Sequence, residues 1–145
     1  KPAQSPRLPI IIGGKGKKRT PALAARFADE FNVVFEPPDV ATAAIGRVRA
    51  ACAAAGRRPE TMAYSAALVL CCGRDEAEFT RRAEAIGREP AELRENGAAG
   101  TVAEVVEKIE AYRALGISRI YLQTLDLSDL DHLDLVAKEV APQLG

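Results

Sequence analysis

Four short apolar runs that alternate with helical patterns constrain the fold of this chain most strongly. The runs cover residues 8–12, 31–35, 62–72 and 118–123, and apolar residues recur at helical spacing after each of them. Such alternation predicts a parallel sheet whose strands are joined by right-handed crossover helices. The first run is apolar at every position, which is typical of a strand covered on both faces.

The number of these strand–helix units sets the size of the fold. Four units fill 145 residues, whereas a complete (β/α)8 barrel takes about 250 residues. We therefore predict an α/β fold of the TIM-barrel type, in which the chain forms about half a barrel as one domain over residues 1–145. An insertion is expected at about 74–100, where the alternation pauses. An open flavodoxin-like sheet is the alternative.

Helix boundaries can be predicted from capping residues. Thr20, with Pro21 after it, is expected to cap the first helix, and Thr101 with Glu104 forms a capping box for a strong helix over 102–115. A last helix is expected over about 129–144. The apolar stripe of the first helix is Leu23, Ala24, Phe27 and Ala28, and that of the last is Leu130, Leu133, Val136, Ala137 and Val140.

The loop after the first run carries the clearest functional pattern. It reads Gly13, Gly14, Lys15 and Gly16, followed by two lysines, Arg19 and Thr20. Glycines expose backbone N–H groups, the next helix presents its positive N-terminal end, and the basic side chains add charge. This combination predicts a phosphate site, with a solvated basic turn as the alternative. The loop matches neither the Walker A motif nor the Rossmann motif, because Arg19 stands where the third Rossmann glycine would be.

Charge and cysteine content exclude several classes of function. The formal net charge is zero, so the sequence gives no support for nucleic-acid or membrane-surface binding. No apolar run approaches the roughly 20 residues of a membrane helix. Three cysteines without framework spacing favour a reducing, cytoplasmic environment, and Cys71 and Cys72 are expected to be buried thiols. The sequence contains no cysteine–histidine cluster, so it does not predict a metal site.

Several segments together resemble a known family. Residues 9–16 (PIIIGGKG) and 23–32 (LAARFADEFN) are similar to a conserved stretch of luciferase-like monooxygenases, and residues 100–106 (GTVAEVV) with 114–117 (ALGI) resemble a later segment. The chain departs from the family pattern at Val102, where proline is usual, and at Phe31, where tryptophan is common. Residues 123–127 and 130–133 look most like the branch that uses coenzyme F420.

The resemblance implies a fold and a cofactor. The chain would supply the last four units of the barrel, with residues 10–12 in its fifth strand and 118–123 in its eighth. Coenzyme F420, or alternatively FMN, would bind at the carboxyl ends of the strands and act on a small organic substrate by hydride transfer or oxygen activation. Gly13 and Gly14 would contact the cofactor phosphate through backbone amides, flanked by Lys15, Gly16 and Thr20.

Other polar residues have weaker assignments. Gln123 lies near the carboxyl end of the last strand, points the same way as Tyr121 and is a candidate for the cofactor-ring pocket. Glu36 either faces the barrel mouth or belongs to a turn. His132 is expected to be solvated or to lie near a helix N-terminus, with a catalytic role as the alternative, and the charged segment 75–88 is expected to be a solvated helix face. Asp29 and Asn32 match the family pattern and are expected to be structural. No catalytic residue is assigned within the chain.

Half a barrel leaves two unpaired strand edges, at residues 10–12 and 118–123. Exposed apolar edges promote aggregation unless they are covered. We expect an N-terminal half of about 150 residues or more to complete the barrel, with closure by a second copy, and thus a homo-oligomer, as the alternative. A non-catalytic flavin-binding relative and a half-barrel with a role in assembly also remain open.

Overall fold

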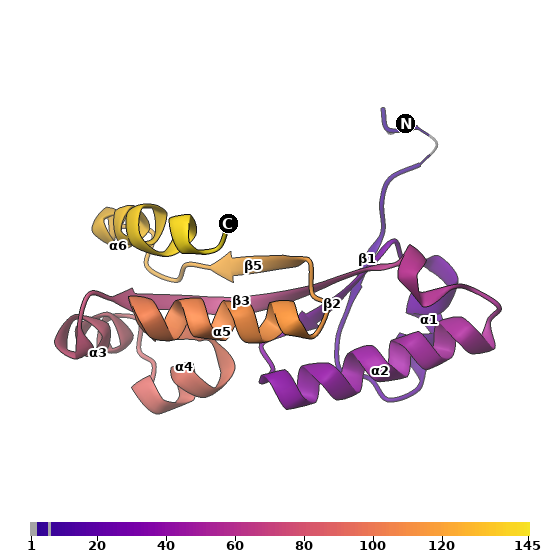
Figure 1. The fold of residues 1–145 in the computed structure, drawn as a ribbon, viewed down its shortest axis with the longest axis horizontal. Coiled ribbons are helices and arrows are strands. Elements are labelled where there is room, and N and C mark those ends of the chain that lie inside the picture. The colour runs from indigo at the N-terminus through magenta and orange to yellow at the C-terminus, as the bar shows by residue number, and fades with distance from the viewer. Residues whose placement is uncertain (1–2, 6) are drawn as a thin grey trace.

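The computed structural model describes residues 3–5 and 7–145, which form a parallel sheet with helices packed against it (Figure 1). Within those residues no helix has the length and apolar character needed to cross a bilayer. The strands are β1 (Ile11–Gly13), β2 (Glu30–Val34), β3 (Ala63–Gly73), β4 (Ala98–Thr101) and β5 (Arg119–Gln123). The helices are α1 (Arg19–Phe27), α2 (Pro38–Ala54), α3 (Glu76–Ala85), α4 (Pro90–Asn96), α5 (Val102–Ala114) and α6 (Leu130–Leu135). Short helical turns cover Pro59–Thr61, Val136–Val140 and Ala141–Gln143.

The strand order decides between the two predicted folds. Strands β1, β2, β3 and β5 lie side by side in chain order and all pair in parallel. A flavodoxin-like sheet reverses its strand order at a switch point, whereas a barrel keeps the chain order. The structure therefore confirms the barrel-type arrangement and excludes the open-sheet alternative.

Strand β3 is the centre of the sheet and runs along most of its length (Figure 1). Residues 63–69 of β3 pair with β2 or β5, and its last four residues pair with β4. Strand β4 was not predicted from the sequence, because the segment AAGT is short and has a single β-branched residue. It forms a strand because the last four residues of β3 extend beyond β2 and β5 and are free to pair with it.

The parallel register divides the side chains between two faces. One face is covered by α2, α5 and the C-terminal turns, and its core includes Phe31, Leu68, Val48 and Tyr112. The opposite face, which we call the inner face, carries Glu30, Asn32, Ser65, Tyr121 and Gln123, as the strand register requires. Tyr121 and Gln123 thus point the same way, as predicted.

Three polar side chains near the start of the strands, Glu30, Asn32 and Ser65, are buried on this inner face. Glu30 accepts hydrogen bonds from Ser65 Oγ at 2.6 Å and from Tyr121 Oη at 3.0 Å, and Arg119 pairs with its other oxygen at 2.6 Å. Asn32 donates to Ser65 Oγ at 2.8 Å, which agrees with its expected structural role. Asp29 is structural too, because it accepts the amide of Ile10.

The stripes predicted for two helices are only partly buried. In α1 and the residue that follows it, Ala24 and Ala28 are buried as predicted, whereas Leu23 and Phe27 are exposed. In the last helix Val140 is buried as predicted, whereas Leu130 and Leu133 are exposed. The prediction assumed that every apolar residue of a stripe packs on this sheet, and the exposed ones do not belong to its core.

Capping was predicted correctly for one helix and incorrectly for another. The Thr101–Glu104 capping box is present at the start of α5. In α1, however, Thr20 lies inside the helix, which begins at Arg19 with Lys18 as its N-cap. The side chain of Thr20 lies beneath Gly16 instead.

Both outer strands have an unpaired edge in the part of the chain that the structure describes. Strand β1 pairs only with β2, and β5 only with β3, as the sequence predicts. The expectation that the first strand is covered on both faces is wrong, since Ile11 is 51% exposed.

Candidate cofactor site

A cavity of about 340 Å³ opens at the carboxyl ends of the strands. On the sheet side it is lined by Lys15, Phe35, Glu36, Val69 and Gln123. On the other side it is lined by Arg88, Glu92, Leu93, Asn96 and Gly97, which belong to α4 and its flanks. Ligands of parallel α/β folds bind at this end of the sheet, so this cavity is the candidate site.

The glycine-rich loop forms one border of the cavity. Gly14 has φ of 131°, a conformation that favours glycine, and its amide donates to the carbonyl of Asn32 at 3.2 Å. Gly16 lies directly over Thr20 at the start of α1, so closely that a Cβ there would collide with the Thr20 hydroxyl. The loop is therefore folded tightly onto the N-terminus of α1, and Gly13 joins it to β1.

Lys15 and Glu36 form an ion pair within the cavity wall. The Glu36 side chain is 12% exposed, and the hydroxyl of Tyr112 donates to its backbone carbonyl. Of the two interpretations of Glu36, the structure supports the one that places it at the mouth. A phosphate that binds Lys15 must compete with this carboxylate.

The structure brings two of the predicted site residues into one cavity. Lys15 and Gln123 both line it, although 107 intervening residues separate them in the chain. The other predicted site residues do not line the cavity: Gly13 ends β1, Gly14 and Gly16 lie in the loop after it, and Thr20 lies in the first turn of α1. Phe35, Arg88 and Asn96 also line the cavity but were not predicted from the sequence, because no motif marks any of these three residues.

The segment between β3 and α5 covers the inner face at the end of β3. Val69 and Cys71 pack there against Phe79, Leu93 and Ala99 in a second, smaller core. Helix α4 thereby becomes the outer wall of the cavity. The segment between β3 and α5 therefore forms one wall of the candidate site.

Comparison with known proteins identifies the family. The family model described as luciferase-like monooxygenase matches residues 1–95, which is more than half of the chain. The chain belongs to the luciferase-like monooxygenase family. A comparison with curated protein sequences finds no match.

Solved structures of similar fold include enzymes of several kinds. An F420-dependent secondary alcohol dehydrogenase superposes with a TM-score of 0.77 at 18% identity, over 97% of this chain and 50% of that one. The F420-dependent tetrahydromethanopterin reductase of Methanopyrus kandleri gives 0.75 at 18% identity, over 95% and 51%. An EDTA monooxygenase from Chelativorans gives 0.69 at 18% identity, over 91% and 45%. This luciferase-like chain spans about half the length of these structures, which confirms the half-barrel prediction.

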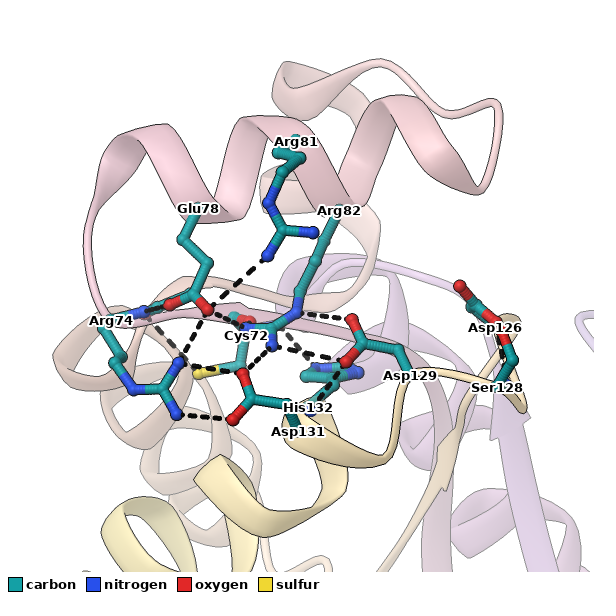
Figure 2. A network of polar contacts seen from close by, with 11 residues as sticks. Cys72, Arg74, Glu78, Arg81, Arg82, Asp126, Ser128, Asp129, Asp131 and His132 are labelled. Atoms are coloured by element: carbon teal, nitrogen blue, oxygen red, sulfur yellow. Dashed lines mark hydrogen bonds and ion pairs between the residues drawn. The ribbon is translucent and has the colours of Figure 1, made fainter.

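An arginine cluster attaches α3 to the start of α6 in this luciferase-like fold (Figure 2). Arg82 is 4% exposed and donates to Asp129 at 2.8 Å, to Asp131 at 2.9 Å and to the carbonyl of Cys72 at 2.9 Å. Arg74 also pairs with Asp131, and these guanidinium groups hold the pKa of the Asp131 carboxyl down to about 2. The prediction that this charged helix presents a solvated face is therefore wrong, because α3 carries the buried Arg82 on the side that faces α6.

His132 is a member of this cluster and is buried. Of its two expected placements, solvated or near a helix N-terminus, the structure confirms the second, because His132 lies in the first turn of α6. Its Nε2 accepts a hydrogen bond from the amide of Cys72 at 2.9 Å, which requires that nitrogen to be unprotonated. Burial also lowers the pKa of His132, so the ring is neutral. It accepts the amide hydrogen of Cys72, which lies beyond the last β3 residue that pairs with β5.

The thiols of the luciferase-like chain are not activated. Cys52, Cys71 and Cys72 are free and buried, as predicted for the last two. Burial raises the pKa of Cys71 and Cys72 to about 11, and the thiolate is the reactive form. Within the described residues no group of three or more His, Cys, Asp or Glu side chains is placed to bind a metal.

Proposed function

We propose that this chain carries the phosphate-binding part of the cofactor site in an F420- or FMN-dependent oxidoreductase. The observation that carries the proposal is the cavity that Lys15 of the glycine-rich loop shares with Gln123 at the carboxyl ends of the strands. The bound cofactor would supply hydride transfer or oxygen activation on a small organic substrate. The alternative is a non-catalytic flavin-binding protein, or a half-barrel whose role is assembly.

The loop has the features required of a phosphate site. The Gly14 amide donates to the Asn32 carbonyl and is therefore not free for the phosphate contact expected of it, so we assign phosphate binding to the amides of Lys15 and Gly16. The absence of a Cβ at Gly16 lets its backbone lie against the Thr20 hydroxyl at the N-terminus of α1, and the positive end of a helix favours an anion. Lys15 adds a full charge to this cradle once it separates from Glu36. Gly13 and Gly14 hold the loop in this position.

Residues across the cavity would hold the rest of the cofactor. Gln123 offers both a donor and an acceptor from the inner face of β5, next to Val69 in the strand register. Leu93 and Gly97 close the opposite side. Together they would orient a polar ring edge and keep water from one side of it.

Two considerations bear on which cofactor and partners this site uses. Coenzyme F420 is favoured because residues 123–127 resemble that branch, and because two similar structures are F420-dependent enzymes. The unpaired edges of β1 and β5 favour completion by an N-terminal half, with a second copy in a homo-oligomer as the alternative. Free buried cysteines agree with a cytoplasmic location.

Replacing Lys15 with alanine tests the phosphate assignment. We expect the variant to bind FMN about ten- to a hundredfold more weakly, because charge-assisted hydrogen bonds contribute roughly 1.5–3 kcal/mol. Riboflavin, which has the ring without the phosphate, should bind as before. Fluorescence titration of the longest natural form of the protein measures both affinities.

Lys17→Ala is the matched control, since it removes a lysine of the same loop that does not line the cavity. Its FMN affinity should fall much less than that of Lys15→Ala. Equal affinity of wild type and Lys15→Ala for FMN would contradict the phosphate assignment.

A further inference from the structure

Phe35, at the end of β2, has an unusual backbone conformation. Its φ is 51°, and it is the one non-glycine residue with positive φ in the part of the chain that the structure describes. Bulky side chains are disfavoured in this region, where glycine and asparagine are tolerated. Two questions follow: what holds the backbone of Phe35 in this conformation, and what its aromatic side chain does there.

The cause lies in two hydrogen bonds that fix the chain on both sides of the turn. The amide of Phe35 donates to the carbonyl of Ala67 at 2.9 Å, and the hydroxyl of the buried Tyr112 donates to the carbonyl of Glu36. Two prolines follow and lead into α2. Because the turn is constrained from both directions, the strained conformation persists.

Burial of the phenyl ring in a hydrophobic core does not offset the cost of this backbone conformation. Phe35 is 40% exposed and belongs to neither hydrophobic core. Phe35 instead lines the cavity between the glycine-rich loop and α4, together with Lys15, Val69 and Gln123. The strained turn thus places an aromatic residue at the cavity and outside both hydrophobic cores.

We propose that Phe35 is the residue of this chain that contacts the heteroaromatic ring of the cofactor, a flavin or a deazaflavin. The inference rests on the proposed function and assigns a second subsite within it. Lys15 and the glycine-rich loop bind the phosphate end, and Phe35 packs against the planar ring, with which an aromatic side chain makes offset or edge-on contact. The turn at Phe35 serves to hold the ring over the cavity.

Three substitutions separate this role from a structural one. Phe35→Gly and Phe35→Asn suit the backbone conformation but remove the ring, and Phe35→Tyr keeps the ring. We expect Phe35→Gly to weaken binding of riboflavin and FMN about tenfold or more, while the urea midpoint of unfolding stays the same or rises. Binding of inorganic phosphate should not change, and Phe35→Tyr should bind all three probes as the wild type does.

The control is Phe27→Ala, which removes another exposed phenyl ring that lies outside the cavity. It should leave riboflavin affinity unchanged. Wild-type riboflavin affinity in Phe35→Gly and Phe35→Asn would overturn the proposal while leaving the phosphate site intact, and so would a fall in stability that accompanies the loss of binding. If wild type binds neither FMN nor F420, the proposed function itself fails, which is a distinct result.

Discussion

Replacing Arg82 with methionine should lower the free energy of unfolding by about 3–5 kcal/mol. Methionine fills much of the same volume but leaves Asp129, the Cys72 carbonyl and the half-buried Glu78 without their shared cation. Removing one partner of a buried ion pair costs far more than the pair contributes, because the remaining charge stays desolvated. Urea unfolding, followed by circular dichroism, measures the change.

Arg81 provides the matched control on the same helix. It is exposed, and its only ion pair is a 3.6 Å contact with Glu78 in the described structure. Arg81→Met should change stability by less than about 0.5 kcal/mol. Similar losses in the two variants would show that the cluster in Figure 2 does not hold α3 in place.

Replacing Gly73 with alanine should destabilise the protein by about 3 kcal/mol, the upper part of the usual range for overpacking. A Cβ at this position would collide with the backbone nitrogen of Phe79 and lie 2.7 Å from the carbonyl oxygen of Asp75. Both contacts are with the backbone at the start of α3, so no rotamer change relieves them. The shift in thermal midpoint measures the effect.

Gly46 is the corresponding control in the interior of α2. A Cβ there would have no neighbour within 4 Å, so Gly46→Ala should stabilise the protein by about 0.5–1 kcal/mol through helix propensity. If Gly73→Ala were as stable as wild type, the close packing of α3 on the end of β3 would be wrong.

The sequence predicts the order and type of the main elements because each leaves a local signal. The apolar runs of β2 and β3 and the capping box of α5 are read directly from neighbouring residues. Strand β4 and the burial of Arg82 leave no such signal, because each depends on what the rest of the chain places beside it. Leu130 and Leu133 were wrongly predicted to be buried, because an apolar stripe does not show which surface, if any, it packs against.

The candidate site is predictable only in part. The glycine-rich loop is a contiguous motif, and Gln123 follows from strand alternation, so both are found without coordinates. Phe35 becomes a candidate only through its backbone angle and the cavity. Arg88 and Asn96 line the site because α4 folds back over the inner face of β3, and such long-range contacts have no pattern in one sequence.

The most direct test of the account is an equilibrium titration of the longest natural form of the protein with FMN and with F420, followed by visible absorption. The account predicts that at least one cofactor binds at one site per chain, and that inorganic phosphate competes with it. Lys15→Ala should weaken that binding. No spectral change with either cofactor would contradict the assignment of the cavity as a cofactor site.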